Sequence, residues 1–416
     1  MIETSEGMPT VSQFVRPGQV HPETNVGQRQ NPTVRDDSSP VNFNSSVCVS
    51  VVIPAYKAAH CIAAALDSVL AQTFSDFEIV VVNDGSPDTE ALEQVLQKYL
   101  PRVRYFKHKN QGPSSSRNRG IVEARGKYVA FLDADDFWLP EHLASQIAIL
   151  RGTPSLGLVY SDSLVVRDGK CIRKTFDRER QEKPVTFEAL LGELCTVSTS
   201  TTVASRKELL AAGLFDENMT RCEDFDLWLR MAFRGTTMTF SPQAHVCHLV
   251  SGSGLSSNRY EMKRALIDVY RKIDSSLPLS QTQKELLRQR CEWTEAIAEL
   301  DLAKQFIHAG DYEKALLSAK RASSVLRSWR IDLAVIALAR APRCFGVYYG
   351  AHEKVLGMCN RIRAASAERK LRMFQPMLCW PLSRTSSSVV LPQSPSVSQP
   401  LGGPVNEGLG TSIPKI

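Results

Sequence analysis

Three carboxylates stand together in the short segment FLDADDFW, residues 131 to 138. Two apolar residues, typical of the end of a buried strand, precede Asp133, Asp135 and Asp136, and two aromatic residues follow. Neighbouring carboxylates raise each other's pKa, and burial raises it further. A divalent cation removes this conflict, and Mg²⁺ or Mn²⁺ is often held by one or two carboxylates together with phosphate oxygens. The Asp-x-Asp pair therefore indicates either a metal–diphosphate site or a solvated acidic turn.

A second segment, NQGPSSSRNRG at residues 110 to 120, supplies positive charge. It contains a glycine turn, three serines, Arg117 and Arg119, and apolar periodicity resumes at Ile121. This pattern predicts a loop that runs into the start of a helix. Backbone N–H groups, hydroxyls and a forked guanidinium suit a phosphate or a ribose. The alternative is an ordinary serine-rich helix start whose arginines face solvent.

Strands and helices that would position these groups alternate between Val47 and about Asn258. Parallel sheets with helices on both faces have continuous apolar strands of this kind, so we predict an α/β fold with a mainly parallel sheet. Ligands of such sheets bind beyond the carboxyl ends of the strands. Asp84 and the aspartates of 133–136 lie at two such ends, although Asp84 could also simply shape its turn. The predicted strands are VSVVIPAY, FEIVVVNDGSPD, VRYFKH and YVAFLDADD.

A third acidic group lies in RCEDFDLWLRMA, residues 221 to 232. Apolar residues at helical spacing follow it, which places Glu223, Asp224 and Asp226 in the first turn of a predicted helix. Acidic residues there can simply stabilise the helix N-terminus. The other interpretation is that one of them is a general base.

Four regions are expected along the chain. Residues 1–46 and 376–416 are rich in Pro, Ser, Gln, Asn and Gly and are predicted to be disordered. Residues 47–258 form the α/β region. Residues 259–375 are predicted to be helical, with one hairpin that resembles a tetratricopeptide unit and turns at Gly310.

The composition fits a globular protein, with 416 residues, 43% hydrophobic and 23% charged residues, and a net charge of +6. Ten cysteines without a C-x-x-C pair indicate reduced thiols and a cytoplasmic location. The N-terminus MIETSEGMPT lacks the basic and apolar regions of a signal peptide. No run of eighteen apolar residues occurs, so no transmembrane helix is expected.

In their order and spacing, the segments resemble glycosyltransferase family 2. They are VSVVIPAYKAAHCIAAALDSVLAQTFSDFEIVVVNDGSPDT, NQGPSSSRNRGI, YVAFLDADD and GLFDENMTRCEDFDLWLRMA. The resemblance covers about residues 47 to 258 and implies the GT-A fold, here with a helical C-terminal extension. It also implies inverting transfer of a sugar from a nucleotide diphosphate sugar to a hydroxyl acceptor, with Mn²⁺ or Mg²⁺ as cofactor. We expect a UDP-sugar as the donor.

The resemblance also implies a nucleotide-sugar site. Pro54, Tyr56 and Asp84 would border the base and ribose, and Arg117 would lie by the nucleotide. Asp133 would contribute both to this site and to the metal site.

For the metal and the chemistry, the resemblance implies that Asp133 and Asp135 form the Asp-x-Asp pair, with Asp135 nearest the metal. It makes Asp224 the general base, with Glu223 beside it. Many relatives have a further histidine ligand after the last strand, where this chain has HVCHLVSGSGLSSN. His248 is a weak candidate for this ligand and could equally be structural. The part SGSGLSSN is expected to be a flexible lid.

Other classes of protein fit less well. A catalytically inactive nucleotide-sugar-binding or scaffolding protein would keep the fold, and the departure near His248 favours it slightly. A nucleotidyltransferase would need a glycine-rich basic loop after the first strand, where this chain has PAYKAAH. No G-x-x-x-x-G-K-[ST] motif exists, which excludes a P-loop kinase.

The acceptor is expected to be a glycan or a lipid-linked molecule of cell-surface polysaccharide or glycolipid synthesis, bound by variable loops at about 165–200. Residues 320–375 have twelve basic and three acidic residues, a net charge of +9, mixed with aromatic and apolar residues. This mixture indicates either a helix on an anionic membrane surface, at the inner face of the membrane, or the solvated face of a helical bundle. No nucleic-acid motif accompanies it, so no nucleic-acid partner is expected.

Overall fold

The computed structural model describes residues 47–179, 181–250 and 258–350. The chain divides into two compact units, residues 1–357 and 358–416, and every described residue belongs to the first unit. Both predicted disordered tails and the predicted lid, except its last residue Asn258, lie outside the described residues.

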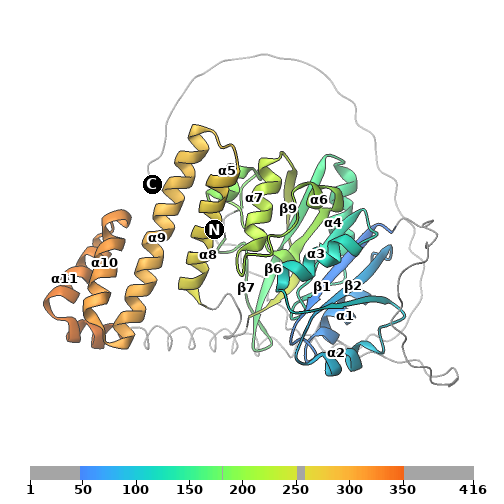
Figure 1. The fold of residues 1–416 in the computed structure, drawn as a ribbon, viewed down its shortest axis with the longest axis horizontal. Helices are drawn as coiled ribbons and strands as arrows, with labels where there is room; N and C mark the ends of the chain where they lie inside the picture. Colours follow the sequence, from blue (N-terminus) through green and yellow to red (C-terminus); the bar gives the residue numbers. More distant parts are fainter. Residues whose placement is uncertain (1–46, 180, 251–257, 351–416) are drawn as a thin grey trace, which may run out of the picture. The chain divides into compact units, whose positions relative to one another are not determined.

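The first four strands form a parallel sheet, as their apolar sequences predict, and they lie in the order β3-β2-β1-β4. Beyond β4 the sheet continues as β8-β6-β9-β5, with β7 paired to β6 (Figure 1). The β4–β8, β8–β6, β6–β7 and β9–β5 pairs are antiparallel and the β6–β9 pair is parallel, so the whole sheet is mixed. The strands are β1 (Val49–Ala55), β2 (Phe77–Asp84), β3 (Val103–His108), β4 (Tyr128–Phe131), β5 (Phe137–Trp138), β6 (Leu156–Arg167), β7 (Lys170–Lys174), β8 (Thr202–Ser205) and β9 (Thr237–Leu249).

Helices cover both faces of this sheet, as predicted. Successive side chains of a strand point to opposite faces. Val51 and Ile53 of β1 therefore pack in one core with α1, α2 and α4, and Val52 packs in the other with α3 and α7. These helices are α1 (Ile62–Leu70), α2 (Thr89–Leu96), α3 (Pro113–Glu123), α4 (His142–Gly152), α5 (Phe187–Leu191), α6 (Arg206–Ala211) and α7 (Glu223–Phe233).

After residue 258 the described chain is helical, with α8 to α11 and a further helical segment over 342–350. The predicted turn is confirmed: Gly310 ends α9 in the left-handed region at φ 78°, and Asp311 caps α10 by accepting the N–H of Lys314. Tyr270 and Ile273 of α8 are fully buried in the same core as Trp228 of α7. Helix α8 is therefore packed against the α/β region. The helices are α8 (Arg259–Ser276), α9 (Gln281–Ala309), α10 (Tyr312–Leu326) and α11 (Trp329–Arg340).

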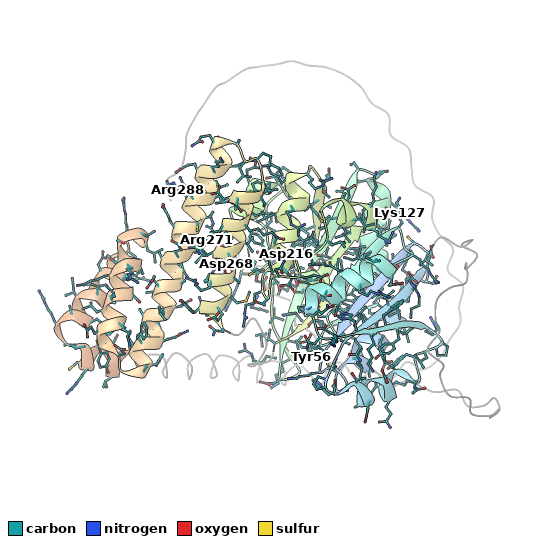
Figure 2. All side chains as sticks on the ribbon, in the orientation of Figure 1. Tyr56, Lys127, Asp216, Asp268, Arg271 and Arg288 are labelled. Atoms are coloured by element: carbon teal, nitrogen blue, oxygen red, sulfur yellow. The ribbon has the colours of Figure 1, made fainter. Side chains whose placement is uncertain are left out.

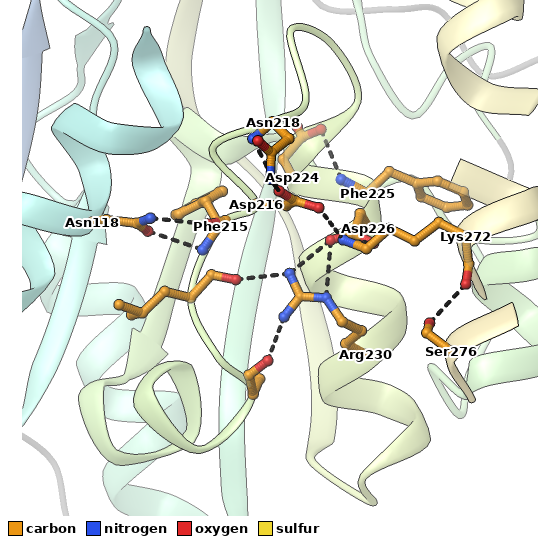
Figure 3. Close-up of polar contacts among 12 residues, drawn as sticks. Asn118, Phe215, Asp216, Asn218, Asp224, Phe225, Asp226, Arg230, Lys272 and Ser276 are labelled. Atoms are coloured by element: carbon orange, nitrogen blue, oxygen red, sulfur yellow. Dashed lines mark hydrogen bonds and ion pairs between the residues drawn. The ribbon is translucent and has the colours of Figure 1, made fainter. Parts of the chain in front are cut away.

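A polar link also joins α8 to α7 (Figure 3). The carboxylate of Asp226, in the first turn of α7, is fully buried. One oxygen accepts two hydrogen bonds from Arg230, at 2.9 and 2.7 Å. The other lies 2.9 Å from Nζ of Lys272 in α8, and this Nζ lies 2.7 Å from Asp216. Lys272 therefore holds together α8, the start of α7 and the loop before it.

We expect Lys272→Met to lower the free energy of unfolding by about 1 to 3 kcal/mol at pH 7, because a buried carboxylate oxygen of Asp226 loses its partner. Lys272 also depresses the pKa of Asp216, chiefly through their hydrogen bond. A depressed carboxyl pKa contributes stability above its unfolded pKa, and this contribution disappears as pH falls through the folded pKa. In urea unfolding measured across pH, the difference in unfolding free energy between Lys272→Met and the wild type should therefore become smaller at acidic pH. Exposed Arg271→Met on the same helix is the control and should lower the free energy of unfolding much less. An equal loss in both variants would contradict the role of Lys272 as the partner of Asp226.

Candidate active site

The predicted site residues gather at the carboxyl ends of parallel strands. Pro54 lies near the end of β1 and exposed Tyr56 follows it (Figure 2), while Asp84 ends β2. Asp133 and Asp135 follow β4. The loops after β1 and β2 are tied together, since N–H groups of the first bond to side-chain oxygens of the second at 2.6 and 3.0 Å. The arrangement matches the edge at which such sheets bind ligands.

Asp84 is buried, and its carboxylate is occupied by the protein itself. Its two oxygens accept the backbone N–H groups of Gln111 and Gly112, at 2.8 and 2.9 Å. Nδ1 of His108 lies 3.5 Å from the same carboxylate. Asp84 therefore holds the loop that begins α3, which is the turn-shaping role that the sequence left open. Its predicted contact with a base or ribose stays a prediction.

Arg117 lies between the two acidic groups. This buried guanidinium donates to Glu223 and to Asp133, both at 2.7 Å. Burial alone would lower the pKa of Arg117, but the two carboxylates raise it more, so it stays charged. Residues from α3, the loop after β4 and the start of α7 are thereby joined through one side chain. The sequence placed Arg117 beside a nucleotide and did not predict this bridge.

Asp224 is half-buried in the first turn of α7. One oxygen accepts the hydroxyl of Thr199 at 2.9 Å, and the other accepts the N–H of Phe225 at 2.8 Å. Burial and the neighbouring Glu223 raise the pKa of Asp224 to about 6. A carboxylate with a raised pKa, held in one orientation, has the properties of a general base that works near neutral pH.

Thr199 lies at the end of the loops, about 165–200, that the sequence predicted to bind the acceptor, but the sequence did not indicate a role for it beside the base. It begins a short 3₁₀ helix, η2 (Thr199–Thr201), whose next residue contacts the acidic loop. The hydroxyl of Ser200 accepts the N–H of Asp133 at 3.1 Å, and its carbonyl accepts the Nε1–H of Trp138 at 2.9 Å. The run of serines and threonines in this segment is the signal that could have indicated a polar lining.

We expect Thr199→Val to shift the acid limb of the kcat/KM–pH profile upward by about one pH unit. The hydroxyl stabilises the ionised form of Asp224, so its loss raises the pKa further, and a hydrogen bond to a charged group is worth about 1.5 to 3 kcal/mol. Thr199→Ser should keep the wild-type profile. Thr201→Val is the matched control, since that hydroxyl donates to the carbonyl of Ser198 in the same turn. If the Thr199→Val profile does not move, Asp224 is not the titrating base.

Asp133 and Asp135 both have accessible side chains. Although the Asp135 side chain is exposed, partial desolvation by the surrounding loop, together with the charges of Asp136 and Asp133, raises its pKa to about 6. This concentration of negative charge fits a divalent cation. In the described part of the chain, however, no three or more His, Cys, Asp or Glu residues are arranged to hold a metal. Two carboxylates would thus need water and diphosphate oxygens to complete the coordination, as Mg²⁺ sites commonly do.

Within the described residues, no group of three or more His, Cys, Asp or Glu side chains includes His248, and its expected role as a weak metal ligand stays a prediction. Its Nδ1 lies 3.0 Å from the buried carboxylate of Asp136, and this hydrogen bond raises the pKa of His248 to about 9. Metal-binding histidines commonly donate one ring N–H to a carboxylate, so this pairing fits both the structural and the metal-binding interpretation. The other oxygen of Asp136 accepts the N–H of Leu249 at 3.1 Å. Asp136 therefore ties the acidic loop to the end of β9.

Comparison with known proteins identifies the family. The glycosyl transferase family 2 model matches residues 50–190. The chain is 30% identical over 230 residues to the amylovoran biosynthesis glycosyltransferase AmsB of Erwinia amylovora, covering 53% of this chain and 76% of that protein. It is 28% identical over 220 residues to UDP-Glc:alpha-D-GlcNAc-diphosphoundecaprenol beta-1,3-glucosyltransferase WfgD of Escherichia coli, covering 52% and 83%. The chain belongs to glycosyltransferase family 2.

The fold has a counterpart among solved structures. S. aureus TarS 1-349 in complex with UDP-GlcNAc superimposes with a TM-score of 0.50 at 18% identity, over 69% of this chain and 90% of that one. The predicted GT-A fold is confirmed. A longer relative, an uncharacterized glycosyltransferase of Rickettsia bellii, is 29% identical over 298 residues, which are 69% of this chain and 41% of that protein. The chain thus spans about two-fifths of that relative. Among the described helices, none combines the length and apolar character needed to cross a membrane.

Proposed function

We propose that this chain is an inverting glycosyltransferase that transfers a hexose from a UDP-sugar to a hydroxyl of a glycan or lipid-linked acceptor. The observation that carries the proposal is the position of Arg117, which bonds at 2.7 Å both to Asp133 and to Glu223. This single buried cation keeps the predicted donor-side carboxylates next to the predicted base. Inverting transfer needs this proximity, because the acceptor oxygen attacks the carbon that the diphosphate leaves.

In this proposal each group has one task. Asp133 and Asp135 would hold Mn²⁺ or Mg²⁺ against the donor diphosphate, together with oxygens of the diphosphate. A bound cation supplies Lewis-acid stabilisation of the leaving group. Asp224 accepts the proton of the acceptor hydroxyl, and Thr199 keeps its carboxylate oriented during that transfer. Arg117 remains charged between its two carboxylates and fixes the distance between donor and base.

The names of similar proteins support the choice of substrates. WfgD is named for a UDP-glucose donor and a diphosphoundecaprenol acceptor, and AmsB for the synthesis of amylovoran. We therefore propose a role in cell-surface polysaccharide or glycolipid synthesis. The proposed location is the cytoplasm, at the inner face of the membrane, with an anionic membrane surface as the partner of residues 320–375.

A catalytically inactive scaffold is the second candidate, and the observation that favours it is that no third His, Cys, Asp or Glu of the described residues joins Asp133 and Asp135 in a metal-binding group. Against it stand the intact carboxylates at 133, 135, 223 and 224, since a binding protein has no need of an oriented base. Purified protein should be incubated with Mn²⁺ and a panel of UDP-, GDP- and dTDP-sugars, and the released nucleotide measured. Release from UDP-sugars is expected; nucleotide binding without release would favour the scaffold. The anomeric configuration of the product, read by NMR, tests inversion.

A further inference from the structure

Helix α11 has an apolar stripe on its surface. Trp329, Leu333 and Ile336 are 67%, 54% and 46% exposed. Their spacing of four and three residues places them on one side of the helix. Arg340 follows four residues after Ile336 and continues the same stripe. Scattered exposed apolar residues are ordinary, but three in line on one helix mark a surface that binds something.

The opposite side of α11 already has its packing partners. Leu338 is 3% exposed and lies in a cluster with Ile307 of α9 and Ala315 of α10. At 3.6 residues per turn, the nine residues from Trp329 to Leu338 turn the helix by about 180° from one face to the other. The exposed stripe is therefore not the side that holds α11 to its hairpin.

The stripe is surrounded by positive charge. Residues 320–350 contain six basic residues and one acidic residue, a net charge of +5. The single acid, Asp332, accepts a hydrogen bond from the hydroxyl of Ser323. Within the described ranges, Arg330, Arg340 and Arg343 form no ion pair. The surface thus combines apolar and aromatic side chains with basic side chains whose charge is not neutralised nearby.

We propose that this α11 face, defined as Trp329, Arg330, Leu333, Ile336 and Arg340 of α11 together with exposed Arg343 near the start of the next helical segment, binds the surface of an anionic lipid bilayer. A helix of this kind lies in the plane of the interface, with its apolar stripe below the headgroups and its basic side chains among them. An anionic lipid complements both kinds of side chain, because its acyl chains contact the apolar stripe and its headgroup pairs with the arginines.

Charge argues against the other occupants. A second copy of this chain would bring another surface of +5 against the first, and like charges oppose such contact. Residues 351–375 also lack complementary charge, since they contain six basic and two acidic residues, a net charge of +4. The anionic bilayer is the partner whose charge complements this face.

Membrane binding by the α11 face is a property separate from the proposed transfer reaction. It also supports a lipid-linked acceptor, and that step rests on the proposed function. A lipid-linked acceptor is confined to the bilayer surface. An enzyme held at this surface meets its acceptor at a far higher local concentration than one in bulk solution.

The test is flotation of the purified full-length protein with vesicles of neutral phosphatidylcholine, or of phosphatidylcholine with about 30% phosphatidylglycerol, at low and high salt. We expect the wild type to float with the anionic vesicles at low salt, and to be released at high salt because screening shortens the reach of the charges. The variant Arg330→Gln/Arg340→Gln/Arg343→Gln should lose about 100-fold in partitioning. The variant Trp329→Gln/Leu333→Gln/Ile336→Gln should lose at least about tenfold.

Matched controls are available on other elements. Exposed Lys127, Arg271 and Arg288 (Figure 2) can be changed together to glutamine, which removes the same net charge elsewhere. Exposed Leu317→Gln on α10 is the apolar control. Both controls should float like the wild type. All variants should keep the wild-type melting temperature and the same release of nucleotide from a soluble donor, which separates membrane binding from catalysis.

The proposal is overturned if the wild type stays at the bottom of the gradient with anionic vesicles at low salt. It is overturned equally if it floats with neutral vesicles alone, or if both α11 variants float as well as the wild type. Flotation lost only on deletion of 351–416, with the α11 variants unaffected, would assign the contact to that segment. If the protein binds nucleic acid but not the vesicles, the basic residues of this face bind another partner and the proposal is wrong.

Discussion

The Asp224→Asn variant is expected to transfer sugar roughly 10²- to 10⁴-fold more slowly than the wild type, the usual size of a general-base effect. Asparagine keeps the shape of the side chain and can still accept the hydroxyl of Thr199, which now bonds at 2.9 Å. It cannot take the proton of an acceptor hydroxyl. Steady-state kinetics with a UDP-sugar should therefore show a lower kcat and a nearly unchanged KM for the donor.

The pH profile provides a second measurement on the same variant. Burial and Glu223 raise the pKa of Asp224 to about 6. Because the base works only when ionised, wild-type kcat should fall as pH falls through this value, and the residual rate of the variant should lose that limb. Exposed Asp268→Asn on α8 is the control and should keep the wild-type rate and profile. If Asp224→Asn loses donor binding while kcat holds, Asp224 positions the donor and is not the base.

The part of the fold that follows from local sequence is the part that the sequence predicted. β1, β2, β3 and β4 are continuous apolar runs that end in turn residues, so their strand character and parallel direction follow from the chain itself. The later strands depend on pairing between distant segments. β8 has four residues and lies between β4 and β6, and its neighbours are set by contacts across the sheet. No pattern within so short a strand could have indicated this pairing.

The candidate site was likewise predicted only in part from the sequence. The sequence placed its carboxylates at strand ends and at the start of α7, because periodicity and turn residues locate element ends. It could not show which side chains meet. Arg117 and Glu223 are 106 positions apart, and Asp136 and His248 are 112 apart. These pairs arise from folding, and they turn a collection of predicted residues into two connected groups around the Asp-x-Asp loop.

The largest loss is expected for Asp135→Ala, which should abolish both transfer and the metal-dependent part of nucleotide binding. Without this carboxylate, Asp133 would be the only member of the Asp-x-Asp pair left to bind a divalent cation. One oxygen of Asp133 already bonds to Arg117 at 2.7 Å. A Lewis acid contributes several kcal/mol to the stabilisation of the leaving group, so its loss corresponds to about 10³-fold or more in rate. Titration calorimetry of UDP binding in the presence of Mn²⁺, compared with EDTA, measures the metal-dependent part of nucleotide binding without any turnover.

The same variant should not lose stability, which separates a metal ligand from a structural residue. Partial desolvation and the charges of Asp136 and Asp133 raise the folded pKa of Asp135 to about 6. An acid with a raised pKa binds more protons in the folded state, so its ionised form lowers stability as pH rises from its unfolded pKa toward the raised value. At about pH 7 without metal, Asp135→Ala should therefore melt at or above the wild-type temperature. Added Mn²⁺ and UDP should raise the melting temperature of the wild type but not of the variant, while exposed Asp268→Ala responds like the wild type. If Asp135→Ala transfers sugar at the wild-type rate, the metal assignment is wrong; if it melts well below the wild type, Asp135 supports the fold.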